Sequence, residues 1–218
     1  MSLKVLHVAH GIEQEQTGAG YAVPRMCCAL AQRGVEIKLA ALDLGGEVLD
    51  SVSKADRVEI YRFPYIWPRK IGYSRALRSF LKDAMKQVDI VQTHFLWSYP
   101  GTSAARIASS NGKPLIMMPR GALFHEALSK SHLAKSLWFK FVDGPALKEA
   151  QCVVATSEKE AESINKLLQP RRLEVIPEGI DFPNLVDKAL SRQIVLNMIG
   201  NGDLEKYLLY LGYLSPHK

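Results

Sequence analysis

Short apolar segments alternate with amphipathic ones along this chain, and this alternation constrains its fold more than any other feature. The apolar segments have the length of buried strands and span residues 3–9, 35–42, 58–63, 89–95, 115–118, 152–155 and 173–176. Between them, apolar residues recur at helical spacing over residues 21–32, 74–87, 101–110, 133–150 and 157–168. This order predicts an α/β fold, a doubly wound, Rossmann-like parallel sheet of about seven strands flanked by helices.

The composition excludes several classes of protein. With 47% hydrophobic and 23% charged residues, the chain can bury a core, which excludes a disordered protein. Three cysteines, two of them adjacent, exclude a disulfide scaffold, and their apolar surroundings predict buried thiols. No apolar run approaches the ~18 residues of a membrane span, and the first residues lack the pattern of a signal peptide. These features predict a cytoplasmic protein.

The alternation stops near residues 181–184, where a Pro/Asn turn follows the last expected strand. We therefore expect the first domain to span residues 1–183. A helix-like stretch and a Gly/Asn break follow, and the apolar run Tyr207–Leu211 then resembles the first strand of another sheet. A globular chain is not expected to end on an unpaired apolar strand. We interpret residues 184–218 as a linker helix and the first strand of a truncated second α/β domain, in a fragment of a longer protein.

Residues that directly follow the strands are the candidates for ligand binding, because open parallel sheets bind ligands beyond the carboxyl ends of their strands. Gly18 and Gly20 open the first helix, where backbone N–H groups can approach an anion or a sugar, and a simple turn is the alternative. His94 ends the fourth strand, where it is either a core histidine or a ligand contact.

The fifth and sixth strands supply three further candidates. Because an unpaired guanidinium is costly to bury, we expect Arg120, with Gly121 beside it, to contact a ligand. Thr156 lies at the start of a helix, where capping is its first role and ligand contact its second. We expect Arg120→Ala and His94→Ala to cut activity about tenfold or more while costing less than ~1 kcal/mol of stability.

Several catalytic and metal-binding motifs are absent from the sequence. It contains no P-loop, no Gly-x-Ser-x-Gly elbow and no Cys/His cluster with zinc spacing. Glu158, Glu160 and Glu162 fall on different sides of a helix, so we interpret them as solvated surface. We therefore expect no metal site.

Residues 57–86 carry the whole net charge of the chain. Their eight basic minus two acidic side chains give +6, as do the chain's 28 minus 22. This segment suits an anionic partner, either a phosphorylated or lipid-linked acceptor or a membrane surface reached through Arg75, Arg78, Lys82 and Lys86. Leu77, Phe80, Leu81 and Ala84 should face the sheet. A solvated helix face is the alternative, and a patch this short without a binding motif argues against nucleic acid.

Motifs spread over nearly the whole chain resemble those of one family. A Gly-rich loop at 17–20 precedes a helix, and Val88–His94 reads VDIVQTH. The most specific motifs are Met118–Leu123 (MPRGAL), Ala155–Glu160 (ATSEKE), Val175–Asp181 (VIPEGID) and Leu209–Lys218 (LYLGYLSPHK). The chain resembles the N-terminal half of a family 4 glycosyltransferase with the GT-B fold, from a group of retaining enzymes that use nucleotide-sugars.

The resemblance implies transfer of a sugar from a nucleotide-sugar donor to a glycan or lipid-linked acceptor, with retention, in cell-envelope or exopolysaccharide synthesis. It implies a cytoplasmic enzyme that can associate peripherally with the inner face of the membrane. It also implies that no metal or other cofactor is needed, because positive groups stabilise the leaving diphosphate. Lys218 matches the family lysine for that diphosphate, while Gly18, Gly20, His94 and Arg120 would line the cleft. The family's Glu-x7-Glu motif is absent, so the catalytic residues stay unknown and we expect the chain alone to be inactive.

The chain departs from the family pattern at a few positions. Glu178 stands where Asn is usual, Tyr213 where Arg is common, and Pro119-Arg120 where many members have His-Asp. Two other classes of protein stay open. One is an NAD(P)-dependent oxidoreductase, whose fingerprint Gly18-Ala19-Gly20 imitates although Val23 replaces its third glycine. The other is a non-catalytic sugar- or nucleotide-binding module.

Overall fold

The computed structural model describes residues 2–13, 18–48, 54–66, 68–129 and 132–179, and also Val52, Ile194 and Asn197. The chain forms two compact units, Met1–Glu178 and Gly179–Lys218. The first unit ends shortly before the expected boundary at residue 183 and contains nearly all of the described residues. Of the expected linker helix, only Ile194 and Asn197 are described, and both are helical. The expected strand Tyr207–Leu211 lies outside the described residues, as does Lys218.

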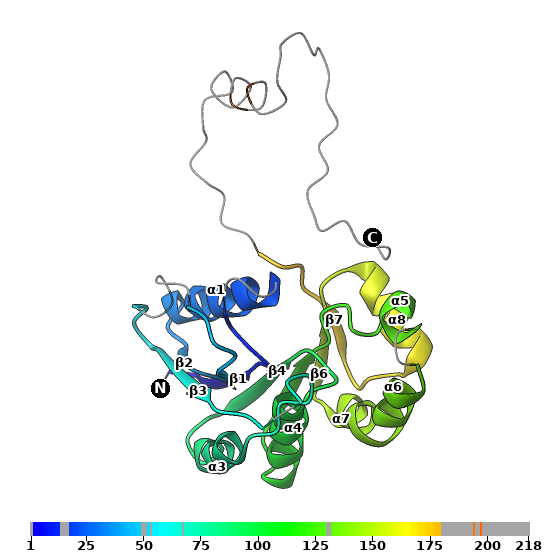
Figure 1. Ribbon diagram of the computed structural model, residues 1–218, viewed down its shortest axis with the longest axis horizontal. Helices are drawn as coiled ribbons and strands as arrows, with labels where there is room; N and C mark the ends of the chain where they lie inside the picture. The colour runs from blue at the N-terminus through cyan, green and yellow to red at the C-terminus, as the bar shows by residue number, and fades with distance from the viewer. Residues whose placement is uncertain are drawn as a thin grey trace. The chain divides into compact units, whose positions relative to one another are not determined.

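One seven-stranded parallel sheet organises the first unit and confirms the predicted fold class (Figure 1). Its strands are β1 (Lys4–Val8), β2 (Glu36–Leu42), β3 (Val58–Phe63), β4 (Ile90–His94), β5 (Leu115–Met118), β6 (Cys152–Ala155) and β7 (Leu173–Val175). Their order is β3-β2-β1-β4-β5-β6-β7, so β1 pairs with both β2 and β4. The strand order reverses between β1 and β4, and open α/β sheets bind ligands at such a switch point.

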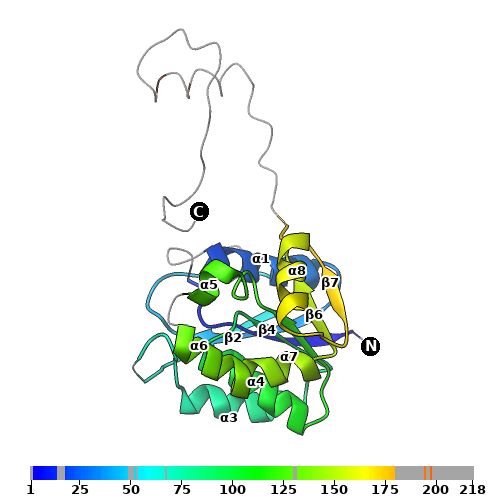
Figure 2. The ribbon, with the colours of Figure 1, turned by 90° about the vertical axis from the view of Figure 1, so that its right-hand side faces the viewer.

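Helices cover both faces of the sheet, as a doubly wound fold requires. They are α1 (Gly18–Gln32), α3 (Arg75–Ala84), α4 (Tyr99–Ser110), α5 (His125–Ser129), α6 (His132–Trp138), α7 (Gly144–Glu149) and α8 (Glu158–Leu167). Figure 2 shows α1 and α8 on one side of the sheet and α3, α4 and α7 on the other. Across the described part of the chain, no helix combines the length and the apolar character that a bilayer span needs.

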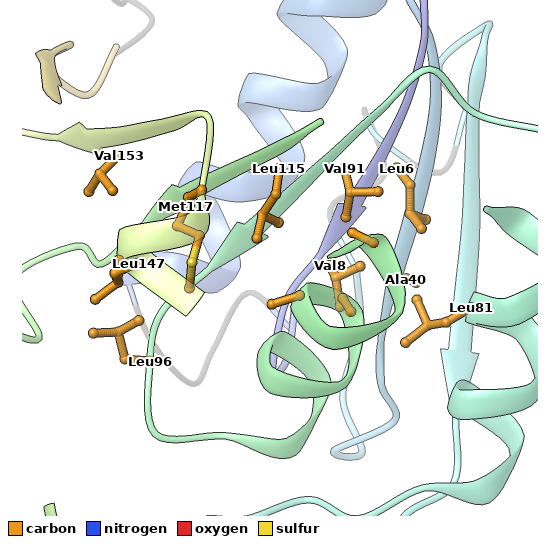
Figure 3. Packing of buried hydrophobic residues seen from close by; sticks show 14 of the residues in the cluster. Leu6, Val8, Ala40, Leu81, Val91, Leu96, Leu115, Met117, Leu147 and Val153 are labelled. Carbon is orange, nitrogen blue, oxygen red and sulfur yellow. The ribbon is translucent and has the colours of Figure 1, made fainter. Parts of the chain in front are cut away.

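The core consists of two layers, one on each face of the sheet. Alternate residues of β1 serve different layers, with Leu6 and Val8 in the larger cluster and Val5 in the smaller one under α1. Figure 3 shows the larger cluster, in which Leu81 of α3 and Val91 of β4 join these β1 side chains. A fully buried leucine contributes about 1.5–3 kcal/mol of hydrophobic stabilisation, so both layers hold the strand ends of this sheet firmly in place.

Helix α3 confirms most of the predicted amphipathic pattern. Ser74 caps it, since the Ser74 hydroxyl accepts a hydrogen bond from the Leu77 N–H at 3.2 Å. The buried face holds Leu77, Leu81 and Ala84, with Phe80 half-buried, and the exposed cations are Arg75, Arg78 and Lys82. The helix ends at Ala84, so the expectation that Lys86 extends this helical face was wrong, and Lys86 lies exposed beyond the C-cap.

The helix expected over residues 133–150 is divided by a π-helical turn at Phe139–Asp143, between α6 and α7. The Gly144 N–H donates to the carbonyl oxygen of Phe139, five residues earlier. A Cβ added to Gly144 would lie 2.5 Å from that oxygen, so glycine permits the wide turn. The sequence predicted an irregularity at Gly144-Pro145, but neither the π turn before it nor the short helix α5 was predicted.

Candidate functional site

A cavity of about 520 Å³ lies at the carboxyl edge of the sheet, beyond the ends of β1 and β4. Its lining consists of His10, Gly11, Glu13, Leu44, Arg69, Lys70, Phe95, Leu96, Trp97 and Ser98. The volume falls within the usual range for small-molecule sites. The strand rule predicted this edge of the sheet, where His10 and Gly11 follow β1, and Arg69 and Lys70 belong to the basic segment 57–86 for which the sequence predicted an anionic partner. The other lining residues were not candidates from the sequence.

Glu13 fixes the wall of the cavity that the loops after β1 and β2 form. Its buried carboxylate accepts hydrogen bonds from the Leu44 N–H at 2.9 Å and from the Arg62 guanidinium at 3.1 Å. Arg62 also pairs with Asp43. Because Arg62 neutralises Glu13, this buried acid does not make the cavity repel an anion.

Phe95 and Trp97 hold the opposite wall in a strained conformation. Their φ angles are +66° and +64°, which bulky residues rarely adopt. The Trp97 N–H donates to the Asp143 carboxylate at 2.9 Å, and the Thr102 hydroxyl donates to it at 3.3 Å. Burial raises the pKa of Asp143, and the hydrogen bond from the Trp97 backbone opposes this shift. Asp143, in the π turn, therefore positions Trp97 at the cavity.

Buried polar atoms on the cavity lining lack hydrogen-bond partners in the described part of the chain. They are His10 Nδ1, Trp97 Nε1 and Ser98 Oγ. Native proteins satisfy nearly all such groups, so these atoms mark positions where a ligand or an ordered water binds. Aromatic rings combined with a few convergent polar atoms can hold a sugar, because one sugar face packs on a ring while its hydroxyls take the hydrogen bonds.

His7 of β1, His94 of β4 and Arg120 after β5 form a directed chain of hydrogen bonds. Arg120 Nε lies 3.4 Å from His94 Nδ1, and His94 Nε2 lies 3.1 Å from His7 Nδ1. A guanidinium only donates, so His94 accepts at Nδ1 and carries its proton on Nε2, which donates to His7. The two imidazole rings are stacked with their centroids 5.4 Å apart.

Both histidines are fully buried and neutral at pH 7. Burial lowers the pKa of His7 to about 3, and the nearby Arg120 charge lowers it further. Burial also lowers the pKa of His94 well below its usual value, with His7 and Arg120 contributing. The structure therefore supports the core interpretation of His94, and it argues against the expectation that His94 can be replaced without loss of stability.

Arg120 follows β5 with a φ of +52°, and its side chain is only 6% exposed. Its Nη1 pairs with the Glu178 carboxylate, and its guanidinium lies over the Phe95 ring at 5.6 Å. The guanidinium is thus buried but paired with Glu178. The sequence did not predict this ion pair. Arg120 Nη2 is buried without a partner among the described residues, so ligand contact by Arg120 stays a prediction that rests on this atom.

Glu160 corrects the interpretation of the acids on α8. Glu158 and Glu162 are exposed, but Glu160 is fully buried. Its carboxylate accepts hydrogen bonds from the Gly121 N–H at 2.5 Å and from both the N–H and the hydroxyl of Thr156 at 2.7 Å. Glu160 thus joins the loops after β5 and β6. Because these donors are already bound, direct ligand contact by Gly121 and Thr156 stays a prediction.

Gly18 and Gly20 form the first turn of α1 rather than a loop before it. A Cβ on Gly20 would lie 2.1 Å from the carbonyl oxygen of Glu13, so glycine is required for the close approach of the loop after β1. This packing supports the structural alternative for Gly20 and leaves its role in anion binding a prediction. The role of Lys218 also stays a prediction, because Lys218 lies outside the described residues.

Comparison with known proteins assigns the family. The profile of Glycosyltransferase Family 4 matches residues 17–182, which is more than half of the chain. The chain belongs to Glycosyltransferase Family 4. The matched segment of this family 4 chain begins just before α1 and contains His94, Arg120, Glu160 and most of the cavity lining, but not His7 of β1 or the lining residues His10, Gly11 and Glu13 in the loop after β1.

One curated relative of this family 4 chain is the GDP-mannose:cellobiosyl-diphosphopolyprenol alpha-mannosyltransferase of Xanthomonas oryzae pv. oryzae, 31% identical over 120 residues. The match covers 52% of this chain and 30% of the relative's length. Anabaena HepE in complex with UDP-glucose shares the fold, with a TM-score of 0.56, 13% identity, and coverage of 82% of this chain and 44% of HepE. Arabidopsis thaliana UGT89C1 also shares the fold, with a TM-score of 0.56 and 12% identity. The match covers 91% of this chain and 55% of UGT89C1.

Proposed function

We propose that this chain is the acceptor-side domain of a retaining glycosyltransferase, which transfers a sugar from a nucleotide-sugar to a glycan or lipid-linked acceptor in cell-envelope or exopolysaccharide synthesis. The match of Glycosyltransferase Family 4 to residues 17–182 carries the proposal. The Xanthomonas relative supports the choice of substrates, because its name includes a GDP-mannose donor and a diphosphopolyprenol acceptor. HepE supports a nucleotide-sugar donor, because that protein was solved with UDP-glucose.

In this proposal the cavity at the β1/β4 switch point holds the acceptor. Trp97 and Phe95 provide aromatic surface for a sugar ring, and the unpartnered atoms of His10, Trp97 and Ser98 take its hydroxyl groups. Arg120 Nη2 supports the reacting end of the acceptor or a donor phosphate. The first turn of α1 and Lys218 contribute positive potential for the donor diphosphate, so that charge stabilisation replaces a metal ion.

The test is a transfer assay on the full-length protein that contains this chain. GDP-mannose and UDP-glucose are offered as donors with cellobiosyl-diphosphofarnesol as the acceptor, and products are identified by mass spectrometry and NMR. We expect one donor to be used with retention, in the presence of a metal chelator as well as in its absence. No transfer, together with tight binding of NAD or NADP in calorimetry, would overturn the proposal. The 218-residue chain alone is expected to be inactive.

A substitution in the site refines this test. We expect Arg120→Ala to lower the rate of transfer by about tenfold or more, because one charge-assisted donor at a reacting centre contributes at least that much. Arg172→Ala is the matched control, since Arg172 is an exposed arginine directly before β7 and its partner Glu174 lies on that strand. Equal activity of both variants would remove Arg120 from the site.

A further inference from the structure

The turn that carries Arg69 and Lys70 is a further element of the site, and both residues belong to the basic segment 57–86 for which the sequence predicted an anionic partner. The turn follows β3 and is closed by an antiparallel bridge between Ile66 and Tyr73, in which the Ile66 N–H donates to the Tyr73 carbonyl at 2.8 Å. The Pro68 carbonyl accepts the N–H groups of residues 71 and 72 at 3.0 and 3.1 Å. Arg69 and Lys70 therefore lie at the tip of a defined turn.

The structure fixes this turn against the mouth of the cavity. The Tyr99 N–H donates to the Ile71 carbonyl at 2.7 Å, and the rings of Tyr73 and Tyr99 pack edge to face with their centroids 4.7 Å apart. Gly72 has a φ of +67°, and a Cβ at this position would lie 2.3 Å from Leu42 and 3.0 Å from the His10 ring. The turn thus packs directly on His10, a lining residue, and both Arg69 and Lys70 line the same cavity.

The charge at the mouth of the cavity is positive and available. Arg69 and Lys70 are exposed, and neither forms an ion pair with an acid in the described part of the chain. Glu13 is the acid on the lining, and Arg62 already neutralises it at 3.1 Å. Two adjacent cations above a sugar-sized cavity match a diphosphate joined to a sugar, because each phosphate oxygen can accept a charge-assisted hydrogen bond.

Apolar side chains beside these cations indicate which diphosphate the turn meets. Ile66 is 60% exposed and Ile71 is 40% exposed, and they lie on the same turn as Arg69 and Lys70. A nucleotide-sugar offers a polar nucleoside on the far side of its diphosphate, whereas a lipid-linked acceptor offers an apolar chain. Exposed isoleucines next to a pair of cations fit the lipid-linked acceptor.

We propose that Arg69 and Lys70 bind the diphosphate of a lipid-linked acceptor, whose first sugar enters the cavity against Trp97 and whose lipid chain leaves over Ile66 and Ile71. The proposal rests on the proposed glycosyltransferase function and specifies its acceptor as an isoprenoid-diphosphate glycan. It assigns acceptor specificity to a turn outside the sheet, separate from Arg120 and the first turn of α1.

The experiment measures ligand binding by the 218-residue chain with isothermal titration calorimetry. The probes are cellobiosyl-diphosphofarnesol below its micellar concentration, free cellobiose, farnesyl diphosphate and GDP-mannose. We expect Arg69→Gln/Lys70→Gln to weaken binding of cellobiosyl-diphosphofarnesol about tenfold or more, and to leave the affinity for cellobiose within about twofold, because cellobiose carries no charge. The charge-conserving variant Arg69→Lys/Lys70→Arg should retain most of the affinity.

A matched control removes the same charge elsewhere. Lys159→Gln/Lys166→Gln changes two exposed lysines of α8, on the opposite side of the sheet from α3, and should bind all probes as the unchanged chain does. Unchanged affinity of the Arg69/Lys70 variant for cellobiosyl-diphosphofarnesol would overturn the proposal, as would failure of the unchanged chain to bind this probe. An equal loss for GDP-mannose would assign the two cations to the donor instead.

These outcomes are separate from a failure of the proposed function. If the full-length protein transfers a sugar to the lipid-linked acceptor while the Arg69/Lys70 variant shows the same KM for that acceptor, the glycosyltransferase function stands and the role of the turn falls. If no transfer occurs to any acceptor, the proposed function fails whatever the probes bind. If the Arg69/Lys70 variant shows a rise of about tenfold in the KM for the acceptor with little change in kcat, this result would support both the glycosyltransferase function and the role of the turn.

Discussion

Among the single residues, Glu160 has the clearest structural role. Its buried carboxylate accepts three hydrogen bonds, from the Gly121 N–H and from the N–H and hydroxyl of Thr156. Glu160→Ala would leave these donors unsatisfied, and we expect it to lower the free energy of unfolding by about 3 kcal/mol. Urea denaturation measures the change. Glu162→Ala, an exposed position on the same helix, is the control and should change stability by less than about 0.5 kcal/mol; equal losses in both variants would contradict the role of Glu160.

The histidine pair makes stability depend on pH. The pKa of His7 falls from 6.5 to about 3 on folding, and that of His94 also falls well below 6.5, so below pH 6.5 the unfolded chain binds protons that the folded chain does not. Stability is therefore complete above pH 6.5 and falls as the pH drops, by up to about 1.4 kcal/mol per pH unit for each histidine. Asp143, whose pKa burial raises, acts in the opposite direction.

The measurement is the free energy of unfolding in urea at intervals between pH 5 and pH 8. We expect the steepest decline below pH 6.5, and we expect His125→Gln to leave the profile unchanged because His125 is exposed. His7→Gln keeps a polar side chain and should make the decline shallower. If the free energy of unfolding of the unchanged chain stays constant between pH 5 and pH 7, the buried histidine pair does not control the pH dependence of stability.

At the scale of elements, α3 presents Arg75, Arg78 and Lys82 to solvent opposite its buried face. We expect this face to bind anionic membranes, since each basic residue contributes about 1 kcal/mol near such a surface. Co-sedimentation with anionic vesicles should be strong at low salt, absent at about 0.5 M salt because of screening, and lost in Arg75/Arg78/Lys82→Glu. The control Arg33/Lys159/Lys166→Glu makes the same change of charge directly after α1 and on α8. No sedimentation at low salt would leave α3 as a solvated face.

Sequence patterns predicted the elements whose signal is local. Each strand and the long helices were found from periodicity, because core burial imposes it on neighbouring residues. The π turn was missed because it depends on the contact between Gly144 and the Phe139 carbonyl, and α5 was missed because five residues carry little periodicity. Buried Glu160 and Asp143 were missed for a related reason: each accepts a hydrogen bond from a loop about forty residues away in sequence, from Gly121 for Glu160 and from Trp97 for Asp143.

The candidate site was predicted by its location rather than by its residues. The rule for open parallel sheets gave the carboxyl edge, and the cavity lies there beyond β1 and β4. The lining residues carry no motif, since Trp97, His10 and Arg69 come from three different loops and meet only in the folded chain. Resemblance to the family, by contrast, identified the fold and the family from motifs that are local in sequence.

At the scale of the whole molecule, the first unit contains a complete pair of core layers. The buried side chains of both clusters come from residues 5–168, and Leu173 and Val175 of β7 pack against the larger cluster. Among the residues that the structure describes, none after Glu178 belongs to either layer. Since Met1–Glu178 also forms one compact unit, we expect this unit to fold without the rest of the chain.

We therefore expect a chain truncated after residue 182 to keep its melting temperature within about 3 °C of the value for the 218-residue chain, as should a deletion of residues 203–218 alone. Truncation after Leu168 is the informative contrast, because it removes β7, which pairs with β6 from Val153 opposite Leu173, and also Glu178, the partner of Arg120. That variant exposes one face of the larger cluster and leaves a buried guanidinium unpaired, so we expect it to unfold or to melt at least about 10 °C lower. Differential scanning calorimetry measures all of these chains, and a loss of more than about 5 °C on removal of residues 183–218 would show that the second unit is integral to the stability of the first.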